Sequence, residues 1–144
     1  MSLRLFNRRN IRKKLENLQQ QWGKPKSDAY HFDWIRAYAN ALNSSSFHQL
    51  TEQTIEDIDF YNLFAFIDRT TSKIGQQFLF KRVTQPTNSS IDELVDFTKK
   101  FSAHSALREE VQLELIKLNH SDAYYIPSLI RTKLLERPKW LNLL

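Results

Sequence analysis

Apolar residues recur at helical spacing from the first turns of the chain onward. The first stripe, at i, i+4, i+7 and i+11, is formed by Ile11, Leu15, Leu18 and Trp22. Gly23 and Pro25 follow it and are typical of a helix end. Basic residues occupy the other faces, so residues 1–26 are predicted to form a basic amphipathic helical arm.

The next stripes predict three helices in the middle of the chain. Ser27 or Asp28 can cap a helix whose aromatic stripe is Tyr30, Trp34, Ala37, Tyr38 and Ala41. Helices are expected at about 60–67 and 74–85, separated by a short break over residues 69–72. Because short connections favour antiparallel packing, we expect Phe64 and Phe78 to meet in the core across this break.

Three more helices are expected in the last third of the sequence. Ser90 and Glu93 have the spacing of a capping box for a helix whose apolar side is Ile91, Leu94, Val95, Phe97 and Phe101. A stripe over residues 107–118 predicts the next helix, and a last one starts near Pro127 and stops before Pro138. No segment alternates with period two, so we predict an all-α fold: an irregular bundle of six to seven helices, divided into the arm (1–26) and a helical domain (27–144).

The composition of the chain excludes most types of catalytic site. The chain has 144 residues with two glycines and no cysteine, which excludes a Walker A loop, a dinucleotide-binding fingerprint and thiolate chemistry. The four histidines have no ligand-like spacing, and Asp57 and Asp59 are interpreted as helix caps. We therefore expect no catalytic and no metal site, and we expect the purified chain not to hydrolyse ATP.

The positive charge is concentrated in the arm. Residues 1–26 carry a net charge of +7 and residues 27–144 a net charge of −2. The candidate contacts for nucleic acid or another anionic surface are Arg4, Arg8, Arg9, Arg12, Lys13 and Lys14. A solvated basic helix without a partner is the alternative interpretation.

A series of short motifs extends through the middle of the chain. It runs Leu50-Thr51-Glu52-Gln53-Thr54, Asp57-Ile58-Asp59, Leu63-Phe64-Ala65-Phe66-Ile67-Asp68-Arg69-Thr70, Ser72, Ile74-Gly75, Leu79 and Gln85-Pro86. In this order the motifs resemble the start of the core (lever) region of the MutS family of DNA mismatch repair proteins, over roughly residues 50–120. The resemblance assigns structural roles to Asp68, Thr70, Gly75, Gln85 and Pro86.

This resemblance implies a non-catalytic lever segment of a MutS-like ATPase. The ATPase domain, with its ATP and Mg²⁺, would lie outside this sequence, so no cofactor is expected within it. The family's Gly-rich ATP-binding loop and mismatch-reading Phe-x-Glu wedge are not visible here. The implied partners are double-stranded DNA, bound weakly and non-specifically by the arm, the remainder of the same protein, and a second copy of the complete protein; the implied location is the cytoplasm.

A membrane-proximal protein-interaction module without a DNA role is the alternative function. Its basis is the presence of basic residues at both ends of the chain: Arg4 to Lys14, and the C-terminal Arg131, Lys133, Arg137 and Lys139, which are followed by Trp140-Leu141-Asn142-Leu143-Leu144. Basic residues followed by Trp and leucines resemble a cytoplasmic membrane flank, so the complete protein is expected to continue into an apolar, membrane-anchoring segment. The competing interpretation is a helix end that packs on the body of the protein.

Overall fold

The computed structural model describes residues 2–41, 48–86 and 91–131, with the backbone alone for 2–9 and 130–131. Across these ranges the chain forms helices and no strand, which confirms the all-α prediction. They are α1 (Ser2–Gln21), α2 (Phe32–Ala41), α3 (Glu52–Asp57), α4 (Phe60–Ile67), α5 (Lys73–Thr84), α6 (Ile91–Ala103), α7 (Ser105–Leu115), α8 (Ile126–Arg131), and the 3-10 helices η1 (Ile116–Leu118) and η2 (Ser121–Tyr125). The short helix α3, which no apolar stripe predicted, is the addition to the six or seven helices expected.

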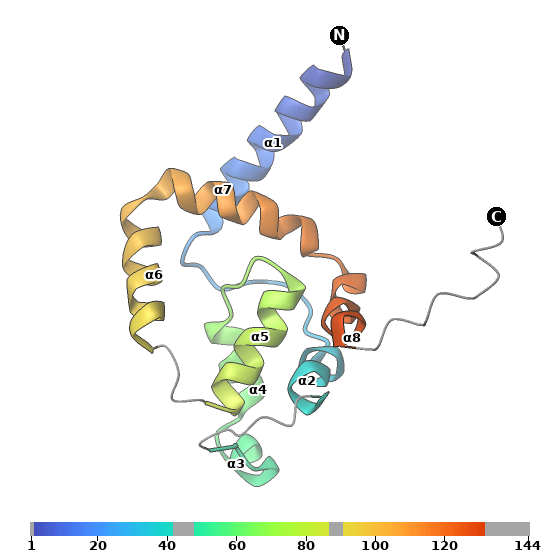
Figure 1. Ribbon diagram of the computed structural model, residues 1–144, viewed down its shortest axis with the longest axis vertical. Coiled ribbons are helices and arrows are strands. Elements are labelled where there is room, and N and C mark those ends of the chain that lie inside the picture. Colours follow the sequence, from blue (N-terminus) through green and yellow to red (C-terminus); the bar gives the residue numbers. More distant parts are fainter. Residues whose placement is uncertain (1, 42–47, 87–90, 132–144) are drawn as a thin grey trace, which may run out of the picture.

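The centre of the molecule is built by α2, α4 and α5, which lie together in Figure 1. α7 runs across one end of this centre, with α6 beside it, and α3 lies at the opposite end. α1 projects beyond α7 and carries the N-terminus away from the other helices. Among the described helices, none has the length and apolarity needed to cross a bilayer.

Aromatic side chains form the core between these central helices. Phe64 of α4 is fully buried, and its ring centroid lies 5.3 Å from that of Phe80 on α5 and 6.1 Å from that of Phe60. Ile35 and Ala39 of α2 and Tyr124 of η2 belong to the same buried cluster. The prediction that Phe64 is a core residue on the α4 side of the break is confirmed.

The matching prediction for Phe78 is wrong. Its side chain is 54 % exposed and lies beside the ring of Tyr38, at a centroid distance of 6.4 Å. The buried residues of α5 are instead Gln76, Gln77, Phe80 and Thr84. Three of these four are polar, so the apolar pattern alone pointed to the wrong face of the helix.

Helix α2 also differs from its prediction. It begins at Phe32, so Ser27 and Asp28 precede it at a distance and do not cap it. Its buried residues are Ile35 and Ala39, whereas the predicted aromatic stripe containing Trp34 and Tyr38 faces away from the core. The buried residues Ile35 and Ala39 each directly follow a residue of the predicted stripe, Trp34 and Tyr38, so the buried face lies one position further along the helix.

The two aspartates interpreted as caps do not act as predicted. Asp57 is the last residue of α3, and Asp59 precedes α4 in a left-handed conformation with φ 48°. The Asp59 side chain makes no bond to the helix backbone; its Oδ2 accepts a hydrogen bond from Asn62 Nδ2 at 2.7 Å. Asp59 therefore fixes the first turn of α4 through a side-chain contact.

The outer helices are packed more loosely than the centre. Neither α6 nor α7 contains a buried residue, and Ile91 and Phe97 of α6 are 65 % and 55 % exposed. α6 does begin at Ile91, as the capping box predicted, but Ser90 lies outside the described residues. The predicted continuation of the last helix to Glu136 also lies outside the described residues, as do the basic residues after Arg131.

Candidate functional site

The break between α4 and α5 is organised by the side chain of Asp68. Its Oδ1 accepts hydrogen bonds from the backbone N–H of Thr70 at 2.8 Å and from Thr70 Oγ1 at 2.7 Å. Two residues later, Ser72 caps α5, because its Oγ accepts from the backbone N–H of Gly75 at 3.1 Å. These local bonds give the chain a defined turn where α4 ends.

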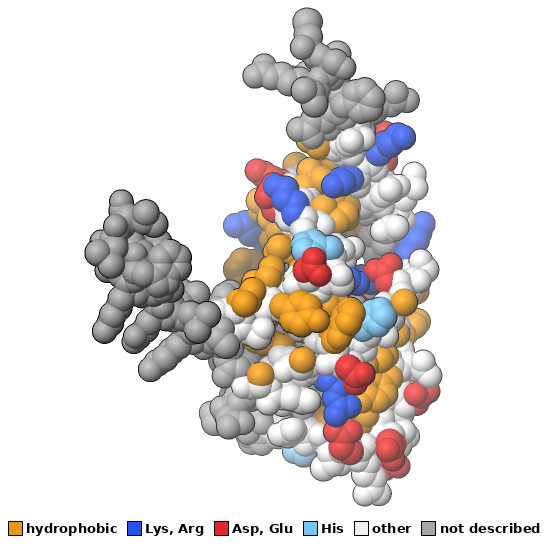
Figure 2. Space-filling view, turned by 90° about the vertical axis from the view of Figure 1, so that its right-hand side faces the viewer, with side chains coloured by type: hydrophobic (Ala, Val, Ile, Leu, Met, Phe, Trp, Pro, Cys, Tyr) orange, Lys and Arg blue, Asp and Glu red, His pale blue; other side chains and the backbone are white. Residues whose placement is uncertain are grey.

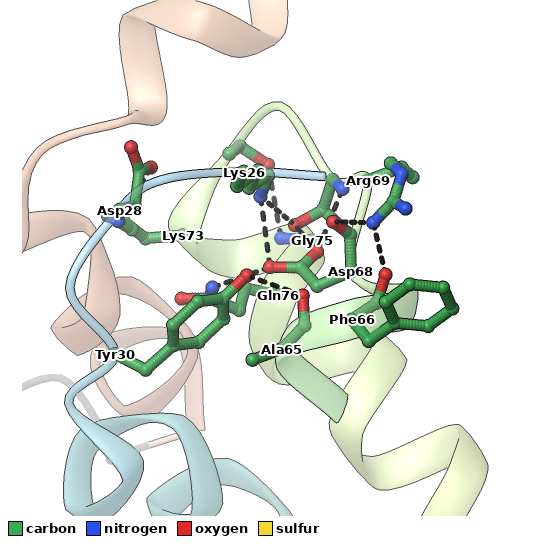
Figure 3. Close-up of polar contacts among 12 residues, drawn as sticks. Lys26, Asp28, Tyr30, Ala65, Phe66, Asp68, Arg69, Lys73, Gly75 and Gln76 are labelled. Atoms are coloured by element: carbon green, nitrogen blue, oxygen red, sulfur yellow. Dashed lines mark hydrogen bonds and ion pairs between the residues drawn. The ribbon is translucent and has the colours of Figure 1, made fainter. Parts of the chain in front are cut away.

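The other oxygen of Asp68 connects the break to two distant segments. Oδ2 accepts from Lys26 Nζ at 3.0 Å and from Gln76 Nε2 at 2.7 Å (Figure 3). Lys26 also donates to Thr70 Oγ1 at 3.0 Å. Lys26 belongs to the segment that follows α1, so an ion pair joins the end of the arm to the break.

A further bond extends the network to the last third of the chain. Gln76 Oε1 accepts a hydrogen bond from the hydroxyl of Tyr124, which lies in η2. We call the five residues Lys26, Asp68, Thr70, Gln76 and Tyr124 the Asp68 node. It joins α5 and the break to segments 42 and 48 positions away along the sequence.

Burial and charge together set the ionisation of the node. Burial alone would raise the pKa of Asp68, but the hydrogen bonds from Thr70 and Gln76 and the charge of Lys26 outweigh it, so the pKa lies below its ordinary value of 3.8. Burial lowers the pKa of Lys26, and the neighbouring Asp68 carboxylate opposes this only in part. Burial likewise raises the pKa of Tyr124 to about 12. At neutral pH the node therefore contains a carboxylate paired with an ammonium group.

Gly75 is required by this turn. A Cβ at this position would lie 3.0 Å from Ser72 Oγ and 3.5 Å from Thr70 Cβ. The close neighbours of Gly75 thus belong to the preceding turn of the same chain. A side chain at Gly75 would push against the serine that caps α5.

The last two motif residues lie at the other end of α5. Gln85 is buried, and its Nε2 donates to the carbonyl oxygen of Ala39 at 3.4 Å, which ties the end of α5 to α2. Pro86 is exposed and follows the helix directly. The five residues that the sequence singled out therefore lie at both ends of α5, with Asp68, Thr70 and Gly75 brought together and Gln85 and Pro86 apart from them.

Among the side chains that the structure describes in the arm, from Asn10 onward, those at the C-terminal end contact the body. Leu18 is buried, Gln19 Nε2 donates to Glu109 Oε1 at 2.9 Å, and the Arg108 guanidinium lies 4.0 Å from the centre of the Trp22 ring. Nearer the N-terminus, Arg12 pairs with Glu16 at 3.1 Å, while Lys13 and Lys14 are exposed. Arg4, Arg8 and Arg9 lie on the α1 backbone, and their side chains are outside the described residues.

Sequence reasoning missed three of the five members of the node. Lys26 was counted only as part of the arm's charge, and Tyr124 was not singled out. Gln76 carried a usable signal, because it begins a Gln-Gln pair that stands between Ile74-Gly75 and the apolar run Phe78-Leu79-Phe80. A polar residue at such a position is either exposed or bonded to a buried partner, and Gln76 is 1 % exposed.

The residues of the node have the chemistry of a structural connection between segments. The lone pairs of Asp68 are occupied by four donors, and its side chain is closed to solvent. Across the described ranges, no three His, Cys, Asp or Glu residues are close enough to hold a metal ion. Comparison with protein-family models, with curated proteins and with solved structures gives no match.

Proposed function

We propose that this chain is a non-catalytic helical lever segment of a MutS-like ATPase, coupling an ATPase domain outside the sequence to DNA or another partner. The observation that supports this proposal is the Asp68 node, which is built around two residues of the family-like motif, Asp68 and Thr70. A lever has to transmit displacement between segments that are far apart along the chain, and the node connects three such segments: the residues after α1, the break with the start of α5, and η2.

The contacts of the node are suited to transmission because they are short and shielded. The Lys26 side chain is 20 % exposed and that of Asp68 is fully buried, so water competes little for their ion pair. A movement of the arm's base therefore displaces Asp68, and with it the first turn of α5. Separating the two charges would leave the buried Asp68 carboxylate without its counter-charge, which is strongly unfavourable.

The proposed DNA contact runs through the arm. α1 projects from the body (Figure 1). Lys13 and Lys14 of this helix are exposed. Binding through phosphates is sequence-independent and weakens steeply as salt rises. The arm would therefore hold DNA weakly and without sequence preference, while the lever relays the movement.

Coupling is tested by amide hydrogen exchange on the complete chain. Lys26→Met removes the ammonium group of the node, whereas Lys24→Met makes the same change at an exposed position two residues away. We expect Lys26→Met to accelerate exchange both at the C-terminal end of α1 and in the first turn of α5, and Lys24→Met to leave both unchanged. Faster exchange at only one of the two ends would contradict coupling through the node.

The partner is tested by a salt titration with a DNA duplex and, in parallel, with anionic vesicles. The arm variant Arg12→Ser/Lys13→Ser/Lys14→Ser is compared with Lys99→Ser/Lys100→Ser/Lys117→Ser, which removes the same charge from exposed positions of α6 and η1. Loss of DNA binding in the arm variant alone would support the proposal. Binding to vesicles without binding to DNA would favour the membrane-proximal alternative.

A further inference from the structure

Apolar side chains are exposed on two sides of the described part of the molecule. One is the side of α2 and α8, where Figure 2 shows them gathered between charged side chains. An apolar groove lies on this side, and its described lining, which includes Trp34, Tyr38 and Tyr125, contains no charged residue that would select a partner. The other is α6, where the order of the charged residues does indicate a partner.

The apolar stripe of α6 is open to solvent. It consists of Ile91, Leu94, Val95, Phe97 and Phe101, and residues 91–100 are exposed around the whole circumference of the helix. The C-terminal end of α6 is held by α7, where Arg108 Nη1 donates to the carbonyl oxygen of Phe101 at 3.0 Å. Isolated helices shorter than about 12–15 residues are marginal in water, and most helical stability in proteins comes from packing an amphipathic face. A partner on this face would therefore stabilise α6.

The charged residues of α6 are separated by sign along the helix axis. Asp92, Glu93 and Asp96 lie in its first half, whereas Lys99 and Lys100 lie in its second half. Asp92 and Lys99 are seven positions apart, so they lie on the same side of the stripe. Glu93 and Lys100 have the same spacing on its other side. Each side of the stripe therefore has a negative end and a positive end.

We propose that the apolar face of α6 pairs with α6 of a second copy of this chain, in antiparallel orientation about a two-fold axis near Asp96. In this arrangement the acidic half of each helix lies beside the lysines of the other, whereas a parallel pair would bring like charges together. Antiparallel packing also brings opposite ends of the two helix dipoles together. The surface is complementary to itself, as a two-fold interface between identical chains requires.

Apolar contacts and charges favour the same register of the two helices. The stripe runs from Ile91 to Phe101, so full overlap places Asp96 at the centre and Ile91 of one copy beside Phe101 of the other. The acidic pair 92–93 and the lysine pair 99–100 lie at equal distances on either side of Asp96. The register that buries the whole stripe therefore also aligns acidic residues with lysines.

A single pair of helices gives a weak association. The 13 residues of α6 form a helix about 20 Å long, and a contact of this length is smaller than a standard interface of about 1,600 Å². We expect a dissociation constant on the order of 100 µM. The chain is then monomeric at the low concentrations used for chemical denaturation.

The test is sedimentation velocity of the complete chain, from tenfold below to tenfold above this dissociation constant. We expect a dimer at the high end of the range. Lys99→Glu/Lys100→Glu makes both halves of α6 acidic and should weaken association by about tenfold or more, because like charges then meet. Lys24→Glu/Lys117→Glu makes the same change in net charge at exposed positions outside α6 and should dimerise as the unmodified chain does.

A second charge reversal separates loss of pairing from loss of folding. Asp92→Lys/Glu93→Lys places lysines in both halves of α6 and should also weaken association. Mixing this variant with Lys99→Glu/Lys100→Glu should restore a dimer, because the two helices then carry opposite charges. A mixture that stays monomeric would overturn the proposal.

The orientation is tested by oxidative cross-linking, since the chain has no cysteine of its own. Chains with Ile91→Cys mixed with chains with Ser102→Cys should form a disulfide between the two variants, because an antiparallel pair brings these positions together. Ile91→Cys alone should not cross-link, because the two copies of this position would lie about 15 Å apart along the axis. Cross-linking of Ile91→Cys to itself would indicate a parallel pair and contradict the proposal.

Other outcomes would overturn the pairing altogether. A chain that is monomeric over the whole concentration range rules it out. A dimer that survives both charge reversals has its interface elsewhere on the molecule. A monomeric chain whose α6 amides are protected from hydrogen exchange only when phosphatidylcholine vesicles are added assigns the stripe to a lipid surface instead.

Discussion

The centre of the molecule and its outer helix pair differ in what keeps them folded. α2, α4 and α5 share a buried aromatic cluster, the Asp68 node joins the end of α4 to α5, and Gln77 of α5 donates to the Trp34 carbonyl of α2, so each depends on residues far away in the sequence. α6 and α7 contain no buried residue, and the apolar side of α6 is exposed at Ile91, Leu94, Val95 and Phe97. Helical structure in α6 therefore rests on local signals, such as the acidic residues Asp92 and Glu93 in its first turn.

This difference shows that two helices with similar sequence patterns have different structural roles. The stripe of α6 is as regular as that of α4, yet α4 buries the two aromatic residues of its stripe, Phe60 and Phe64, and α6 buries none. Periodicity states which face of a helix is apolar, and packing decides whether that face is covered. Substitutions in the two regions should therefore change the free energy of unfolding to different extents.

The largest effect is expected at Phe64. Phe64→Ala leaves a cavity next to Phe60 and Phe80 and should lower the free energy of unfolding by about 3–5 kcal/mol. Chemical denaturation followed by circular dichroism provides the measurement. A loss below about 1 kcal/mol would show that the aromatic cluster is not the main core.

Removing the cation of the node should have the next largest effect. Lys26→Met leaves Asp68 buried without its counter-charge and should cost about 1.5–3 kcal/mol, the range for hydrogen bonds to charged groups. Lys24→Met, at an exposed position, is the control and should change stability by less than about 0.5 kcal/mol. Equal effects of the two substitutions would contradict a structural role of the ion pair.

The same node predicts the response to acid. Because the pKa of Asp68 in the folded chain lies below its ordinary value of 3.8, the stability from its ionisation is complete above that value and lost as the pH falls below it. Asp68→Asn should be less stable at neutral pH and should lose less on acidification. Parallel curves of unfolding free energy against pH for the two proteins would disprove this assignment.

The cap of α5 should contribute less. Ser72→Ala removes the acceptor for the backbone N–H of Gly75 and should cost about 1 kcal/mol. Ser102→Ala, at an exposed position in the last turn of α6, is the matched control. Thermal unfolding of the two variants under identical conditions compares them directly.

The smallest effect is expected on the outer pair. Phe97→Ala removes a ring that is 55 % exposed and should change the unfolding free energy by less than about 0.5 kcal/mol. Phe78→Ala, on the exposed side of α5, should behave similarly. If Phe97→Ala proved as costly as Phe64→Ala, α6 would have a buried role that the described residues do not show.

Sequence reasoning identified the helices better than the faces that they bury. The break after Asp68 and the start of α6 follow from local chemistry, which short-range patterns capture. The buried side of α5 could not be inferred in the same way, because Gln76 and Gln77 are buried through partners contributed by other segments. Hydrophobic periodicity treats such residues as exposed, and it assigned Phe78 to the core for that reason.

The candidate site shows the same difference between local and long-range signals. Asp68, Thr70 and Gly75 could be singled out because they form a short sequence motif with local hydrogen bonds. Lys26 and Tyr124 join them only after the chain has folded, over separations of 42 residues from Asp68 and 48 residues from Gln76. A single sequence contains no signal for pairings over such distances.

The attachment of α1 at its C-terminal end has an electrostatic consequence. A helix rises about 1.5 Å per residue, so positions 4–14 lie roughly 6–21 Å along the axis from the buried Leu18. Over most of that range the distance from Leu18 along the helix axis exceeds the Debye length of about 8 Å at physiological ionic strength. The acidic side chains of the body are therefore largely screened from the tip of the arm. An approaching polyanion would be attracted by the arm and repelled by the body independently.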